Sequence, residues 1–256
     1  MKALLPIVTI LATLPSIANA GSRISYRGID GGASTTVLVG ANQVRIDADS
    51  DSRIIIDPGK ASLLVLHLAD SEYTRIDNAS LRRLVAQVNA TLSQVDDVLA
   101  NVPEELRSSV GDLMGNAGAG AGLKSVSVVN TGRSGSAAGH PCVTWRSESA
   151  GEIVAEACIG GLGAWNLERA DRATVESAVG LLQGWSRQLQ SGALSRYFKA
   201  TSFPSDQVPL RVTQFDGAQR SSSEFSGSDH IDVSESDFRI PTGFRERALE
   251  VPALGR

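Results

Sequence analysis

The amino-acid sequence predicts an α+β fold, because strand patterns, then helical patterns, then strand patterns again follow one another along it. Apolar and polar residues alternate with a period of two between Arg23 and Ile76. The period becomes helical between Leu81 and Leu99, and strand patterns return after residue 124. Strands and helices grouped in this way predict an antiparallel sheet with helices packed on it, not repeated βαβ units.

The first third of the chain predicts an antiparallel meander of short strands. Residues 57–60 (Asp-Pro-Gly-Lys) are the strongest turn signal, and residues 40–42 and 49–51 mark two further turns. The predicted strands cover residues 35–39, 43–47, 53–56, 63–68 and 72–76.

A long amphipathic helix is predicted over residues 81–99, with Asp77 or Asn78 as its N-terminal cap. Pro103 ends this helix and can begin a second one that reaches Met114. The apolar stripe has two interpretations, because it can pack on the sheet or line an apolar ligand cavity. The stripe consists of Leu81, Leu84, Val85, Val88, Leu92, Val95, Val98 and Leu99.

The second half of the chain predicts six more strands and one more helix. Residues 115–122 (GNAGAGAG) predict a flexible joint before them. The helix is expected over residues 170–189, with Val175, Ala178, Leu182, Trp185 and Leu189 on one face. The strands are expected over residues 124–129, 142–146, 152–159, 209–215, 223–225 and 231–233.

Composition places limits on what the protein can do. Hydrophobic residues make up 42% of the 256 residues and charged residues 20%, which is enough apolar material for a packed core. The formal net charge is −4 and aromatic residues make up only 5%. Because phosphate binding needs clustered Lys and Arg, these values argue against a nucleic-acid partner.

Residues 1–20 predict a signal peptide. The basic Lys2 precedes an apolar run that Pro15 breaks, and Ala18-Asn19-Ala20 provides a small-x-small cleavage pattern. The run is shorter than the roughly 20 apolar residues that span a bilayer, and no later stretch is longer, so no membrane span is expected. We therefore expect a periplasmic or secreted protein whose mature chain, residues 21–256, begins at Gly21 and forms a single domain.

Cys142 and Cys158 are the only cysteines. An even number of cysteines in an exported chain predicts a disulfide, here between neighbouring strands of a hairpin. Closing a loop of this size is worth about 3 kcal/mol in the chain-entropy model. Two free buried thiols or a metal pair are the alternatives, although neither cysteine belongs to a C-x-x-C motif.

No motif in the sequence predicts catalytic residues, a metal site or a cofactor. Residues 118–125 resemble a phosphate-binding loop but have Leu123 where the loop needs glycine. Ser134 and Ser136 lack the glycines of a nucleophile elbow. The acidic residues 47–51 begin like a calcium loop but lack its later glycine and glutamate. A hydrolase with a dispersed site, using His67 or His140 as the base, is the remaining enzymatic alternative.

The mature chain resembles an exported bacterial family catalogued as a domain of unknown function. The resemblance rests on three segments: residues 44–57 with Tyr73, residues 132–142 with Cys158, and residues 238–244 (FRIPTGF). That family is similar in outline to periplasmic carriers of lipoproteins and lipids. The resemblance implies a curved antiparallel sheet, an incomplete barrel, with helices packed on its concave side around an apolar cavity. The cysteine hairpin and the Gly-rich joint depart from the carriers.

The leading functional hypothesis is a non-enzymatic exported protein that binds an apolar or acylated ligand between sheet and helices. The partner would be such a small molecule or a lipoprotein. A structural envelope protein with a filled core, binding another envelope protein, is the alternative hypothesis. The residues predicted to line the ligand site are Leu84, Val88, Leu92 and Val95.

Overall fold

The computed structural model describes residues 19–40, 42–48, 50–100, 126–191, 198–200 and 204–249. Most of the expected signal peptide, the second helix expected after Pro103 and the joint at residues 115–122 lie outside these ranges. The N-terminal part contains β1 (Asn19–Ile29), β2 (Thr35–Gly40), β3 (Gln43–Asp47), β4 (Ser52–Asp57), β5 (Ser62–His67), β6 (Glu72–Asp77) and α1 (Asn78–Ala100).

The rest of the described chain adds further strands, one long helix and two short 3₁₀ helices. The strands are β7 (Val126–Ala137), β8 (His140–Ser149), β9 (Glu152–Gly161), β10 (Phe198–Ala200), β11 (Gln207–Asp216), β12 (Gln219–Val233) and β13 (Arg245–Arg247). The helices are η1 (Leu162–Trp165), α3 (Arg169–Leu189) and η3 (Glu235–Phe238).

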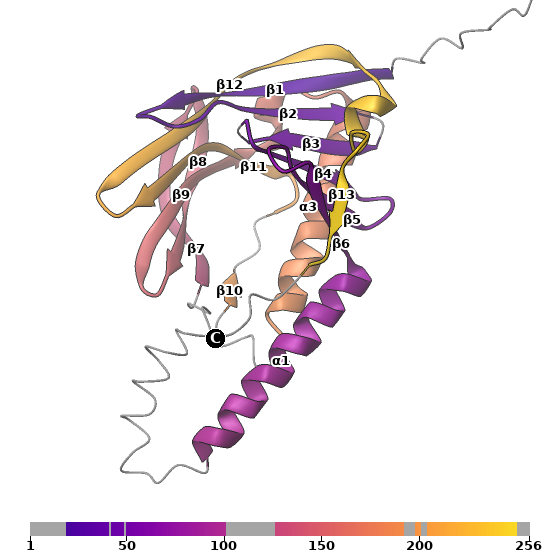
Figure 1. Cartoon of the computed structure of the whole chain (residues 1–256). Helices are drawn as coiled ribbons and strands as arrows, with labels where there is room; N and C mark the ends of the chain where they lie inside the picture. Colours follow the sequence, from indigo (N-terminus) through magenta and orange to yellow (C-terminus); the bar gives the residue numbers. More distant parts are fainter. Residues whose placement is uncertain are drawn as a thin grey trace, which may run out of the picture.

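Among the described residues, thirteen strands form one sheet in the order β10-β7-β8-β9-β11-β12-β1-β2-β3-β4-β5-β6-β13. The strand pairs are antiparallel except at the two edges, where β10 pairs with β7 and β13 pairs with β6 in parallel. The sheet curves strongly but does not close into a barrel, and α3 lies inside the curve (Figure 1). The expected architecture, a curved antiparallel sheet with helices on its concave side, is confirmed.

The larger apolar cluster lies on the concave face. Val37 and Val39 of β2, Val44 of β3 and Ile56 of β4 point to this face and pack with Val175 of α3. Helix α1 follows β6 directly and packs against α3 and the end of β6. Asp77 caps α1, because its carboxylate accepts the Ser80 backbone N–H at 2.7 Å.

The convex face of the same strands has a second cluster. Leu38, Ile55 and Leu66 are buried there under Phe238 of η3, with Phe244 packed at the edge. The segment from η3 to β13 therefore covers the outside of β2 to β6 as α3 covers the inside. This explains why residues 54–56 are three consecutive isoleucines, since both faces of β4 are covered.

Charged groups fasten this outer segment. Arg45 of β3 donates to the backbone oxygen of Asp237 at 3.1 Å and binds Asp47 at 2.6 Å. Arg53 also binds Asp47 at 2.6 Å. Burial raises the pKa of Asp47, but hydrogen bonds from the two arginines outweigh it, so the pKa lies below its usual value. The acidic stretch considered as a calcium loop thus begins with a carboxylate already held by two guanidinium groups.

One stretch of the chain is more ordered than its sequence predicts. None of the strands expected from the sequence includes residues 131–139, but β7 continues to Ala137 and pairs with β8 on both sides of a bulge between Asn130 and Ser134. Gly132 has a φ of 70° inside this bulge, a conformation that glycine adopts without strain.

We predict that Phe238→Ala destabilises the protein by about 3–5 kcal/mol, the usual cost of removing a buried phenylalanine ring. Phe238 is only 3% exposed and is the largest of the fully buried side chains in the convex cluster. Urea unfolding followed by tryptophan fluorescence measures the change. Phe244→Ala, at the partly buried edge of the same cluster, is the matched control and should lower the free energy of unfolding by less. Equal stability of Phe238→Ala and wild type would contradict the covering role.

Candidate functional site

A cavity of about 480 Å³ lies between α3 and the concave face of the sheet. Its volume falls within the range of small-molecule sites, roughly 300–1,000 Å³. The lining is mainly aliphatic and comes from β2, β3, β4, β11 and α3. Representative lining residues are Val37, Val44, Ile46, Val175, Val179 and Val212.

The cavity reaches the protein surface. Leu182 of α3, which lines it, is 39% exposed, and Gln214 of β11 is exposed as well. Ser221 and Ser223 of β12, which are partly exposed, also line the cavity. The site therefore combines an apolar interior with a mouth that carries uncharged polar side chains, and an apolar molecule could enter it from solvent.

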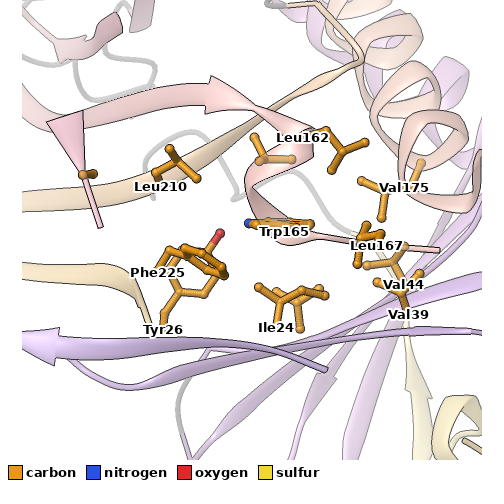
Figure 2. Packing of buried hydrophobic residues seen from close by; sticks show 14 of the residues in the cluster. Ile24, Tyr26, Val39, Val44, Leu162, Trp165, Leu167, Val175, Leu210 and Phe225 are labelled. Carbon is orange, nitrogen blue, oxygen red and sulfur yellow. The ribbon is translucent and has the colours of Figure 1, made fainter. Parts of the chain in front are cut away.

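The inner part of the cavity contains aromatic residues. Tyr26 packs edge-on against Trp165 with ring centroids 6.4 Å apart, and against Phe225 at 6.2 Å (Figure 2). The Tyr26 hydroxyl donates to the backbone oxygen of Pro209 at 2.6 Å. Burial raises the pKa of Tyr26 far above its usual value, and nearby Trp165 opposes this only in part, so Tyr26 stays neutral.

Trp165 Nε1 is buried and has no hydrogen-bond partner among the described residues. Figure 2 shows this nitrogen on the side of the ring that faces Tyr26. Tyr26, Trp165 and Pro209 all line the cavity. Its inner wall thus presents two aromatic rings and a proline, with no charged group among these three side chains.

Two polar contacts hold α3 in place over the cavity. At its N-terminal end, Ser22 of β1 donates to Asp171 with an Oγ to Oδ2 distance of 2.6 Å. Near its C-terminal end, Trp185 donates through Nε1 to the Asn78 side chain at 2.7 Å. Since the first bond joins α3 to the sheet and the second joins it to α1, the helix has little freedom to sink into the cavity.

Asp171 is 6% exposed, and burial is the main reason why its pKa is raised. The Glu168 carboxylate acts in the same direction, whereas the Ser22 hydrogen bond and His230 oppose it. His230 lies 3.9 Å from Glu168. The net effect favours the protonated form of the carboxyl group that anchors α3.

The four residues expected to line a ligand site belong to α1. Leu84 is half-buried and Val88 is buried, but neither lines the cavity under α3. The side chains of Leu92 and Val95 lie outside the described residues. The assignment of these four residues to a ligand site stays a prediction. In the sequence, the only signal of the cavity residues on α3 is an apolar helix face. The only signal of those on the strands is the alternation of apolar and polar residues.

Cys142 of β8 and Cys158 of β9 form a disulfide, with their Cα atoms 5.4 Å apart. This is the hairpin pairing that the sequence predicts. Gly135 of β7 passes beside both sulfur atoms. A disulfide of this kind fits an oxidising compartment outside the cytoplasm.

The residues weighed for other chemistries lie on separate strands. Ser134 and Ser136 belong to β7, and His67 ends β5 at the opposite side of the sheet order. His140 begins β8, and its ring lies 6.1 Å from the Phe225 ring. Within the ranges that the structure describes, no three His, Cys, Asp or Glu residues are grouped closely enough to hold a metal ion. None of the described helices is long and apolar enough to cross a membrane.

Comparisons with known proteins give distant structural likenesses and no family. No family model matches the chain. No curated protein matches it either. The solved structure of PNGF-II matches 90% of this chain at 8% identity and a TM-score of 0.40, and the chain spans 31% of that protein's length. An uncharacterized conserved protein from Thermus thermophilus matches 89% of this chain and 90% of its own, at 8% identity and a TM-score of 0.36. Both TM-scores are too low to assign a function.

We predict that Asp171→Asn changes how stability depends on pH. In wild type the folded state keeps the Asp171 proton above the pH at which the unfolded chain releases it, because the folded pKa is raised. The free energy of unfolding should therefore fall relative to that of Asp171→Asn as pH rises above about 4. The asparagine still accepts the Ser22 hydrogen bond but has no proton to lose.

Urea unfolding of both proteins at several pH values between about 4 and 7 provides the test. The control variant is Asp70→Asn, because Asp70 is exposed in the turn between β5 and β6. Stability curves of wild type and Asp171→Asn that stay parallel over this range would rule out a raised pKa.

Proposed function

We propose that the protein is an exported, non-enzymatic binding protein that holds an apolar or acylated ligand between the sheet and α3. The observation that carries the proposal is the cavity of about 480 Å³ with its mainly aliphatic lining and its opening beside Leu182. The alternative hypothesis of an envelope-interaction protein requires a filled core, and the presence of this cavity favours the binding protein instead. The proposed site differs from the one expected on α1, since α3 forms its helical wall.

The driving force for binding would be removal of the ligand's apolar surface from water. Each buried CH₂ group contributes about 0.8 kcal/mol, so burial of about ten of them supplies roughly 8 kcal/mol, the free energy of micromolar binding, without a charged contact. Two features support a preformed site: the rings of Tyr26 and Trp165 pack against each other, and α3 is held by hydrogen bonds near both ends. In these respects the proposed function is similar to that of the half-barrel carriers of lipids and lipoproteins.

We propose that the protein acts in the periplasm or outside the cell after removal of residues 1–20. The disulfide between Cys142 and Cys158 supports an oxidising compartment. Cleavage after Ala20 would remove Asn19 and Ala20 from the end of β1, where they pair with Val233 and Asp232. From Gly21 onward the pairing of β1 with β12 would remain.

The first prediction of this proposal concerns the native protein. Protein purified from an exported fraction without detergent should carry extra mass in native mass spectrometry. Organic extraction should remove that mass, and its fragmentation should reveal an acyl chain. A refolded, delipidated sample should take up the fluorescent apolar probe N-phenyl-1-naphthylamine. No bound mass together with no probe uptake would contradict the proposal.

The second prediction concerns the cavity itself. Val179→Phe places a larger side chain in the cavity lining, and Leu182→Trp narrows the exposed mouth without entering the core. Each change should weaken N-phenyl-1-naphthylamine binding by about fivefold or more, which corresponds to about 1 kcal/mol. The matched control is Val129→Phe, because Val129 is 38% exposed on β7 and does not line the cavity. If the two cavity variants bound the probe as tightly as Val129→Phe does, the probe would bind outside this cavity.

A further inference from the structure

An open cleft of about 810 Å³ adjoins the mouth of the apolar cavity. Gln214 of β11 and Ser221 of β12 face each other in register and line both spaces. Gly31 lines the cleft and the next residue, Gly32, lines the cavity. A molecule whose apolar part fills the cavity would therefore place its other end in this cleft.

The cleft carries charges of both signs. Asp30 lies in the turn after β1, Asp216 ends β11, and Arg220 lies at the start of β12. All three side chains belong to exposed residues. Among the described residues none of the three has an ion-pair partner, in contrast to Arg211, which is paired with Glu224. Phe215, which directly precedes Asp216 and is half-buried, adds an aromatic ring to the lining of the cleft.

This set of charges discriminates between kinds of headgroup. A purely anionic headgroup would meet two carboxylates and one guanidinium, and a purely cationic headgroup would meet the guanidinium. A zwitterionic headgroup offers an opposite charge to each kind of group in the cleft, because its phosphate can bind Arg220 and its ammonium can lie near Asp30 and Asp216. An aromatic ring such as that of Phe215 also attracts a quaternary ammonium.

We propose that the cleft lined by Asp30, Asp216 and Arg220 binds a zwitterionic phosphate–ammonium headgroup of an amphiphile whose chain occupies the apolar cavity. This inference rests on the proposed function and specifies the class of ligand. The backbone of the turn supports it, since Asp30 has a φ of 50° and Gly31 a φ of 79°. This left-handed pair, closed by the bond from Gly32 N to Ile29 O at 2.9 Å, fixes the position of Asp30 at the rim.

Calorimetric titration with three amphiphiles of equal chain length tests the proposal. The probes are decylphosphocholine, decanoate and 1-decanol, which carry a zwitterionic, an anionic and an uncharged end. Wild type should bind decylphosphocholine more tightly than decanoate. Arg220→Gln should lower the affinity for decylphosphocholine by about threefold to fivefold, which is the effect of losing one exposed ion pair. The affinity for 1-decanol should stay unchanged.

The double variant Asp30→Asn with Asp216→Asn gives the opposite signature for the two charged probes. The double variant should bind decylphosphocholine more weakly and decanoate more tightly than wild type, because it lacks two carboxylates and keeps Arg220. A structural defect would weaken all probes together and would not produce this reversal. The matched controls are Arg247→Gln on β13 and Asp70→Asn, both exposed and outside the cleft.

The outcomes separate the two proposals. Binding of 1-decanol by wild type together with unchanged decylphosphocholine binding by the cleft variants would overturn the headgroup site and keep the apolar site. Tighter binding of decanoate than of decylphosphocholine by wild type would also overturn the headgroup site. Failure of wild type to bind any of the three probes would overturn the proposed function, and the headgroup site with it.

Discussion

Strands β2 to β5 carry apolar side chains on both faces, and the rest of the structure has to cover them. Val37 and Leu38 are neighbours in sequence, yet one is buried in the concave cluster and the other in the convex cluster. A sheet that alternates apolar and polar residues needs a cover on one side only. Here α3 covers the inner face and the segment from η3 to β13 covers the outer face. The sheet, the helix and the C-terminal segment therefore depend on one another.

The cavity follows from how the inner cover is attached. Helix α3 is fastened near its ends by the bonds from Ser22 to Asp171 and from Trp185 to Asn78. Between these points it presents Val175, Ala178 and Val179, whose side chains are short. A helix held at both ends above a strongly curved sheet does not reach the deepest part of the curve, and the remaining space is the proposed binding site. One of these attachments places the Asp171 carboxyl group in a poorly solvated position, 6% exposed, and this burial raises its pKa.

Much of the fold can be predicted from the sequence, because local signals determine it. The strands at residues 43–47 and the helix at residues 170–189 follow from a period of two and a period of 3.6. The disulfide follows from two cysteines on neighbouring strands. The bulged part of β7 is not predicted, since its Gly and Ser residues have low strand propensity and only pairing with β8 orders them.

The candidate site is harder to predict because it depends on curvature and on distant residues. The stripes of α1 and α3 look alike in sequence, and nothing local says which one faces the hollow of the sheet. Alternation identifies two faces of β2 and β3 but not which is concave. Asp30 and Arg220 line one cleft only because β12 pairs with β1 on one side and with β11 on the other. Such a meeting of residues leaves no periodic signal.

The pairing of β1 with β12 also has a consequence for the order of folding. The first strand of the described chain lies in the middle of the sheet, and one of its two neighbours comes from the far end of the sequence, with Gly21 opposite Ile231. The two halves of the sheet cannot be joined until nearly the whole chain is available. Contacts of such long sequence separation form slowly, because the intervening loop must first be closed at an entropic cost. A nascent chain with this connectivity therefore keeps the two halves of its sheet apart until β12 has been synthesised.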